Sequence, residues 1–221
     1  MKVYVNLGNI LEGEFELKDL NILVGYPESG KTLLLNVIHY ALQKDEDALV
    51  KITDSLKEKI VLLKINDIID VESRGGKYNV DSPETLCYIE KMTNAKSFLI
   101  PHDMNKYAKL KALESFRDEL SFLLLEDPDA GLHPKTMKRL ALLLHKIARD
   151  NILIVETHSL TFIDMLRNID KIAREFNEET GLVEISLIVT RKVEKRFKIE
   201  NIDPLSSYIE SYTDEILTIY E

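Results

Sequence analysis

The residues best suited to chemistry form a glycine-rich segment, Gly25-Tyr26-Pro27-Glu28-Ser29-Gly30-Lys31-Thr32. It matches GxxxxGK[ST] at every fixed position. Glycines let a backbone curl so that successive N–H groups point at phosphate oxygens, and a helix that begins at the lysine adds the positive end of its dipole. The segment predicts a binding site for the phosphates of ATP. The residues expected to contact the nucleotide are Gly25, Tyr26, Pro27, Glu28, Ser29, Gly30, Lys31, Thr32 and Leu33.

Two side chains in this segment have distinct expected roles. Lys31 should reach the β- and γ-phosphates as a catalytic cation, and the hydroxyl of Thr32 should bind Mg²⁺. The surroundings support this assignment, because an apolar strand over residues 20–24 precedes the loop and a helical pattern over residues 32–42 follows it.

A second chemical segment follows the apolar strand expected over residues 121–126. The strand ends in Glu126, and Asp127 comes next. Carboxylates at the end of a strand beside a phosphate loop can hold magnesium and polarise an attacking water molecule. By position, Glu126 is the expected magnesium ligand together with Thr32, and Asp127 is the expected general base.

Several segments resemble ABC-type ATPases of the chromosome-maintenance, RecF and overcoming-lysogenisation-defect groups. They are the start, VNLGNILEGEFELKDLNILVGYPESGKTLLLNVIHYAL, and the later LLLEDPDAGLHP, ILIVETHSLTFIDML and EILTIYE. The resemblance covers roughly residues 1–42 and 120–221. It implies a P-loop NTPase fold, ATP and Mg²⁺ as cofactors, and ATP hydrolysis.

The resemblance also implies roles for residues outside the phosphate loop. His158, in Thr-His-Ser, would contact the γ-phosphate, and Asp129 would lie in a loop that communicates between two protomers. His133 is expected to pack the turn that precedes a helix. No functional role is expected for the other histidines, His39, His102 and His145.

The chain departs from this group at features that support rapid hydrolysis. The segment before the second acidic strand, HDMNKYAKLKALESFRDEL, has no Ser-Gly signature, and the only glutamine, Gln43, follows the phosphate-loop helix. Asp127 stands where a longer glutamate is usual, and a misplacement near 1 Å can slow a reaction about 10²-fold. A slow or partner-activated ATPase that acts as an ATP-gated switch is therefore expected.

Two other functions remain open on the sequence. The missing signature and glutamine also suit a nucleotide-binding module without catalysis. A P-loop kinase or GTPase is disfavoured, because no Asn-Lys-x-Asp segment occurs and the candidate lid region holds only Arg117.

The elements that must position these residues predict an α/β fold with a mostly parallel, helix-flanked central sheet. An N-terminal antiparallel segment, with strands at 3–7 and 14–18 around a turn at Glu12-Gly13, and a C-terminal hairpin at 183–192 and 195–202 should join it. Further strands are expected at 60–65, 67–72, 77–80, 96–100 and 151–157. Further helices are expected at 83–92, 106–119, 135–149, 157–166 and 206–220. The whole chain is expected to form one domain, with residues 45–120 as a reduced, divergent inserted lobe.

Composition limits the possible partners and location. A net charge of −9 does not indicate nucleic-acid binding, although basic clusters at 135–139 and 191–198 leave it possible; a solvated surface is the simpler interpretation. The single Cys87, together with the lack of a long apolar run or cleavable leader, suits a cytoplasmic protein without membrane contact. The expected partners are ATP and either a second copy of the chain, in an ATP-dependent homodimer, or an unidentified protein.

Overall fold

The structure, a computed structural model, describes residues 1–6, 10–25, 28–43, 45–55, 62–65, 69–74, 77–80, 96–118, 120–193 and 196–202. The helices are α1 (Lys31–Gln43), α2 (Glu46–Ser55), α4 (Lys106–Ser115), α5 (Pro134–Ile147), α6 (Leu160–Arg167) and α7 (Ile169–Phe176). The strands are β1 (Lys2–Asn6), β2 (Leu11–Glu16), β3 (Leu20–Gly25), β4 (Leu62–Ile65), β5 (Ile69–Arg74), β6 (Lys77–Val80), β7 (Ser97–Ile100), β8 (Phe122–Glu126), β9 (Ile152–Glu156), β10 (Ile185–Val193) and β11 (Arg196–Asn201).

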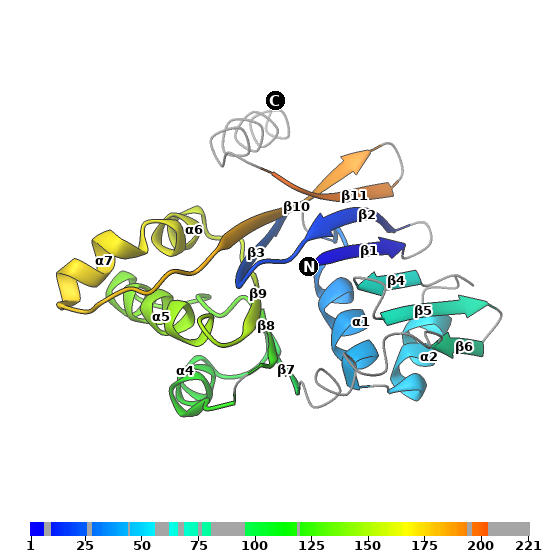
Figure 1. The fold of residues 1–221 in the computed structure, drawn as a ribbon, viewed down its shortest axis with the longest axis horizontal. Coiled ribbons are helices and arrows are strands. Elements are labelled where there is room, and N and C mark those ends of the chain that lie inside the picture. The colour runs from blue at the N-terminus through cyan, green and yellow to red at the C-terminus, as the bar shows by residue number, and fades with distance from the viewer. Residues whose placement is uncertain are drawn as a thin grey trace.

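The described strands form one sheet in the order β6-β5-β4-β1-β2-β11-β10-β3-β9-β8-β7 (Figure 1). From β10 to β7 all neighbours are parallel. From β6 to β2 all neighbours are antiparallel. The hairpin of β10 and β11 joins the two parts, because β11 pairs with β2 and β10 pairs with β3. The predicted α/β class, with a parallel centre and an antiparallel N-terminal segment, is confirmed.

Helices cover both faces of the parallel centre (Figure 1). Side chains alternate along β3: Ile22 and Val24 face a core made with α5 and α6, whereas Leu23 faces a core made with α1. Apolar residues on both faces explain why β3, β8 and β9 read as continuous apolar runs rather than as alternating strands. The centre is therefore held between two helical layers.

Helix starts in this layer follow recognisable local chemistry. His133 caps α5 by accepting a hydrogen bond from the backbone N–H of Lys135, and Pro134 opens the helix, where no partner for its nitrogen is needed. The Ser159 hydroxyl caps α6 by accepting from the N–H of Phe162 at 3.2 Å. α5 thus begins after the loop that follows Glu126-Asp127, and α6 begins directly after Thr157-His158-Ser159.

The prediction of a turn at Glu12-Gly13 is wrong. Both residues lie inside β2, where Gly13 pairs with Val5 of β1. A Cβ at Gly13 would lie 2.1 Å from the carbonyl oxygen of Ile199 on β11, so the glycine allows close approach of two strands rather than a turn. A glycine in a short polar stretch is compatible with a turn or with a close approach of two strands. Ile199, the neighbour that decides between these two, lies far from Gly13 in the sequence.

Other boundaries also differ from the predictions. The helix predicted at 106–119 ends at Ser115, where Phe116 turns to extended backbone, and α2 and α7 are not predicted. The helices predicted at 83–92 and 206–220, and Cys87, lie outside the described residues. Within the described part of the chain, no helix has the length and apolarity to cross a membrane.

Candidate functional site

The site is built at one edge of the parallel centre. Strands β3, β7, β8 and β9 run in the same direction, so their carboxyl ends lie together. These ends deliver Gly25, Ile100, Glu126 and Glu156 to that edge. Open α/β sheets bind ligands at the carboxyl ends of their strands, and this edge therefore holds the candidate site.

The loop between β3 and α1 has the conformation that its glycines allow. Gly25, Glu28 and Gly30 have positive φ angles of 142°, 61° and 84°. A Cβ at Gly25 would lie 1.9 Å from the hydroxyl oxygen of Thr190, so β10 forms a close wall behind the loop. A Cβ at Gly30 would lie 3.1 Å from Ile10, on the approach to β2. Tyr26 and Pro27, also predicted to contact nucleotide, lie outside the described residues.

Ser29 fastens this loop to the sheet. Its side chain is fully buried, and its hydroxyl oxygen lies 2.5 Å from that of Thr190. Thr190 pairs with Gly25 along the strands β10 and β3. Leu33, in the first turn of α1, packs its side chain against the apolar core. The loop is thus anchored by the contact of Ser29 with Thr190 and by the packing of Leu33.

Lys31 lies at the start of α1 and is almost fully buried. Its Nζ donates to the carbonyl oxygen of Gly25 at 3.2 Å and to the Ser29 hydroxyl at 3.3 Å. It lies 4.0 Å from Oε1 of Glu156. Burial lowers the pKa of Lys31, and the negative charges of Glu156 and Asp127 oppose this shift. The ammonium group of Lys31 is thus held between the loop and the end of β9.

Glu156 is the carboxylate that contacts the phosphate loop. Its side chain is 4% exposed, and the Thr32 hydroxyl donates to its two oxygens at 3.2 and 3.4 Å. Burial raises the pKa of Glu156 to about 7, with smaller upward effects from Asp127 and Glu126; Lys31 opposes them. Glu156 is not among the site residues expected from the sequence.

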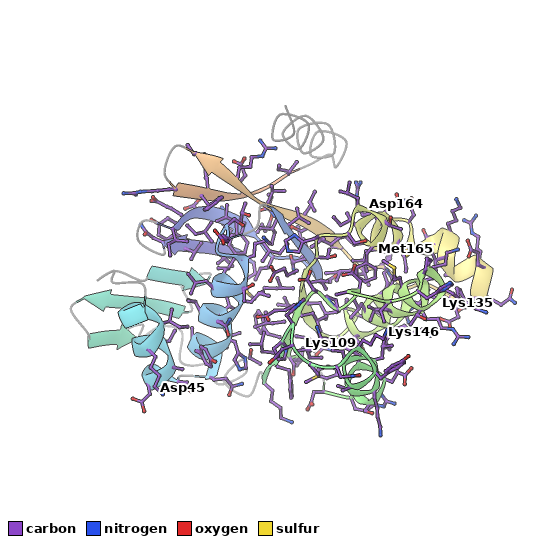
Figure 2. All side chains as sticks on the ribbon, turned by 180° about the vertical axis from the view of Figure 1, so that it is seen from behind. Asp45, Lys109, Lys135, Lys146, Asp164 and Met165 are labelled. Carbon is purple, nitrogen blue, oxygen red and sulfur yellow. The ribbon has the colours of Figure 1, made fainter. Side chains whose placement is uncertain are left out.

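The acidic pair at the end of β8 contacts His102 and Lys109. Oε2 of Glu126 accepts a hydrogen bond from the backbone N–H of His102 at 2.9 Å, and Oδ2 of Asp127 lies 3.3 Å from Nδ1 of His102. The ammonium group of Lys109, labelled in Figure 2, donates to the carbonyl oxygens of Glu126 at 2.8 Å and of Asp127 at 3.4 Å. Burial lowers the pKa of this lysine.

Asp127 itself has an unusual backbone conformation. Its φ is 41°, in the left-handed region that non-glycine residues seldom adopt. Its N–H donates to the carbonyl oxygen of Glu156 at 3.0 Å, which ties the ends of β8 and β9 together. With His102 and Lys109, this bond fixes the Asp127 carboxylate at the edge of the sheet, where 20% of its side chain is exposed.

His158 follows β9 and lies beside the same edge. Its Nε2 is 3.9 Å from Oε1 of Glu156, and 42% of its side chain is exposed. Burial of the remainder, with a smaller effect from Lys31, lowers its pKa. The neighbouring Thr157 is buried and donates its hydroxyl hydrogen to Asp129 at 2.8 Å. Burial raises the pKa of Asp129. The hydrogen bond between Thr157 and Asp129 stabilises the turn that carries His158.

The remaining histidines make local contacts. His133 caps α5, in agreement with its expected structural role. His39 lies in α1 with Nδ1 2.9 Å from the hydroxyl of Ser97, and His145 is buried in α5. His102 is the exception, because it was expected to have no role and lies against both members of the acidic pair.

The donor set at this edge fits Mg²⁺ bound together with a nucleotide. The Thr32 hydroxyl and the Glu126 carboxylate are oxygen donors, which Mg²⁺ prefers. No group of three or more His, Cys, Asp or Glu side chains among the described residues could hold a metal by itself. Magnesium usually uses one or two carboxylates plus substrate phosphates, so a sparse protein site is expected beside a phosphate loop.

Sequence reasoning missed Glu156, His102 and Lys109. Glu156 carried a usable signal, because it ends an apolar strand in the same way as Glu126 and parallel strands share one carboxyl edge. His102 and Lys109 carried none, because their positions depend on β7 lying beside β8 and on how far α4 reaches back to the sheet.

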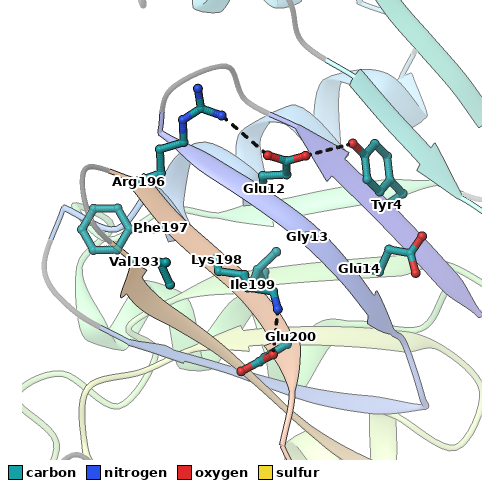
Figure 3. A pocket seen from close by; sticks show the side chains of 10 residues that line it. All are labelled: Tyr4, Glu12, Gly13, Glu14, Val193, Arg196, Phe197, Lys198, Ile199 and Glu200. Atoms are coloured by element: carbon teal, nitrogen blue, oxygen red, sulfur yellow. Dashed lines mark hydrogen bonds and ion pairs between the residues drawn. The ribbon is translucent and has the colours of Figure 1, made fainter.

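A separate hollow lies over β1, β2 and β11 and shares no residue with this edge (Figure 3). Its charged side chains pair with each other: Arg196 lies 3.7 Å from Glu12, and Lys198 lies 3.5 Å from Glu200. Tyr4 donates to Glu12 at 3.4 Å. Arg191, Arg196 and Lys198 thus each lie within ion-pairing distance of an acid, as expected for a solvated surface.

Comparison with known proteins supports the fold. A family profile described as "AAA domain, putative AbiEii toxin, Type IV TA system" matches residues 107–164, which include both acidic strand ends and His158. No curated protein matches the chain by sequence. The SMC head domain from Thermotoga maritima superposes with a TM-score of 0.53 at 12% identity, over 92% of this chain and 98% of that chain.

A second SMC head gives the same result. In that structure the head is bound to the C-winged helix domain of ScpA, and it superposes with a TM-score of 0.54 at 11% identity, over 93% of this chain and 98% of that chain. Likeness at this identity concerns the fold. The chain therefore has the fold of the ABC- and SMC-like P-loop ATPases, as its phosphate loop and its Glu-Asp-Pro and Thr-His-Ser segments predict.

Proposed function

We propose that the chain binds Mg²⁺ and ATP and hydrolyses ATP slowly or on contact with a partner, so that ATP acts as a switch. The observation that carries this proposal is the convergence of the phosphate loop, the acidic pair and His158 at one edge of the sheet. Residues 25–33 hold the phosphates, with Lys31 at the β- and γ-phosphates. Thr32 and Glu126 hold the metal, which neutralises charge on the phosphates.

Asp127 is the proposed general base. Its partly exposed carboxylate can accept a proton from water, and His102, Lys109 and its own N–H fix its position. The short side chain on a constrained backbone leaves little freedom to approach the water, which supports slow turnover. His158 can donate to or sense the γ-phosphate from the turn after β9.

A partner completes the proposal. The matching SMC head is bound to a domain of another protein, and the segment before the second acidic strand of this chain has no Ser-Gly signature. We therefore propose that a second copy of the chain, in an ATP-dependent homodimer, or another protein accelerates turnover.

The proposal also covers domain organisation and location. Residues 1–221 act as a single domain, with residues 45–120 as its inserted lobe, and the chain works in the cytoplasm.

The test measures ATP binding, ATP turnover and oligomeric state in the wild type and in Lys31→Ala. The variant should lose binding and turnover, because it lacks the buried cation of the loop. Lys146→Ala is the matched control, because Lys146 pairs with Glu178 on the surface, away from the loop. Equal ATP binding in Lys31→Ala and the wild type would contradict the proposal.

The alternative is a nucleotide-binding module without catalysis. It is favoured by the contact of His102 with the Asp127 carboxylate, which occupies an acceptor that a general base needs. Asp127→Asn separates the two: it should keep ATP binding and lower turnover at least about 10²-fold if Asp127 is the base. Equal turnover in the variant and the wild type would support the module.

A further inference from the structure

We propose that Glu156 prepares Thr32 to bind Mg²⁺ by accepting its hydroxyl hydrogen. This inference rests on the proposed function and assigns a role to a residue that neither the phosphate-loop pattern nor the acidic pair includes. Glu156 is a positioning residue here, because it acts on the metal through Thr32.

The geometry supports this role directly. The Thr32 hydroxyl lies within hydrogen-bonding distance of both oxygens of the Glu156 carboxylate, at 3.2 and 3.4 Å. A hydroxyl has one hydrogen and two lone pairs. When the hydrogen is donated to Glu156, the lone pairs face away from the carboxylate and are available to a cation. Without an acceptor, the hydrogen is free to rotate into the position of the metal.

Burial makes this contact persistent. Glu156 is 4% exposed and its backbone is fixed in β9 between β3 and β8. The carboxylate also lies 4.0 Å from Lys31 Nζ and 3.9 Å from His158 Nε2. One side chain thus touches the three residues expected around the terminal phosphate and its metal. Partners that orient a metal ligand through a hydrogen bond typically contribute 10–100-fold to metal affinity or activity.

The negative charge of Glu156 should also affect ATP binding directly. The Glu156 carboxylate lies 4.0 Å from Lys31 Nζ, the cation expected at the β- and γ-phosphates, so its negative charge should repel ATP that carries no metal. With Mg²⁺ present, the same charge is attracted to the cation. Glu156 should therefore weaken ATP binding without Mg²⁺ and strengthen ATP binding with Mg²⁺.

The experiment measures ATP affinity in EDTA and across a Mg²⁺ titration at pH 8.5, in the wild type, Glu156→Ala and Glu156→Gln. In Glu156→Ala the Mg²⁺ concentration at half effect should rise about 10–100-fold, while affinity in EDTA stays equal or increases. Glu156→Gln retains an amide oxygen that can accept from Thr32, so its Mg²⁺ requirement should stay closer to that of the wild type. Thr32→Val should reproduce the defect of Glu156→Ala.

The matched control is Glu175→Ala, which removes a surface carboxylate paired with Lys138. Two results would overturn the inference: an unchanged Mg²⁺ requirement in Glu156→Ala, or an equal loss of affinity with and without Mg²⁺, which indicates a structural role. A wild type that binds no ATP under either condition contradicts the proposed function instead. These failures are distinguishable, because the first two need ATP binding by the wild type.

Discussion

Raising the pH should destabilise the nucleotide-free protein through Glu156. Burial raises the pKa of this carboxyl from 4.5 to about 7 in the folded chain. Between these values the folded state holds a proton that the unfolded state releases. The stabilisation is therefore fully present below the unfolded pKa and is lost as the pH rises through the folded pKa.

The size of the effect follows from the shift. The difference between 4.5 and about 7, at about 1.4 kcal/mol for each pKa unit, corresponds to about 3 kcal/mol. The isoelectric point near 5.2 makes pH 5.5 a practical lower limit. About 2 kcal/mol of the total falls between pH 5.5 and 8.5. Changes of this size are a substantial part of the stability of an ordinary domain.

Urea denaturation of the wild type and Glu156→Gln, in EDTA and without nucleotide, measures this effect. The amide does not titrate, so the difference in unfolding free energy between the two proteins should fall by about 2 kcal/mol from pH 5.5 to 8.5. Glu175→Gln, at an exposed ion pair, should follow the wild type. A constant difference between the wild type and Glu156→Gln across this range would show that Glu156 does not bind a proton near neutral pH.

Two further predictions concern the groups that hold Asp127. His102→Leu should lower the rate of ATP turnover at least about 10-fold. His102→Asn should retain most of the rate, because its amide nitrogen can donate from near the position of Nδ1. A steady-state assay measures both variants, and a rate in His102→Leu equal to that of the wild type would show that the contact has no effect. Lys109→Met should lower the unfolding free energy by about 1–3 kcal/mol, because it leaves the carbonyl oxygens of Glu126 and Asp127 without this donor. Thermal denaturation measures this loss, and an unchanged midpoint would show that Lys109 does not stabilise the end of β8.

The parallel centre could be predicted from the sequence because its signals are local. The runs over 20–24, 121–126 and 151–157 are apolar, and the glycine pattern marks the loop that follows the first of them. Glycine at position 25 is required by contact with Thr190, but the pattern identifies it without that knowledge. Long apolar strands and a tight loop thus determine this region within short stretches of chain.

The contacts of the candidate site could be predicted only in part. Each strand end is visible in the sequence, but the order of the strands is not. Glu156 meets Thr32 because β9 lies beside β3, and His102 meets Asp127 because β7 lies beside β8. The incorrect turn at Gly13 has the same cause, since only its neighbour Ile199 explains the glycine.

The position of the β10–β11 hairpin has a consequence for synthesis of the chain. Strands β1 and β2 connect to β3 in the sheet only through β11 and β10, which are made last among the described strands. A ribosome-bound chain that ends before Ile185 therefore has an open strand edge on β3 and lacks Thr190, the wall behind Gly25. Pairing over such long sequence distances is slow and exposes strand edges to aggregation. Closure of the β3 edge and of the wall behind Gly25 thus waits until Thr190 has been synthesised.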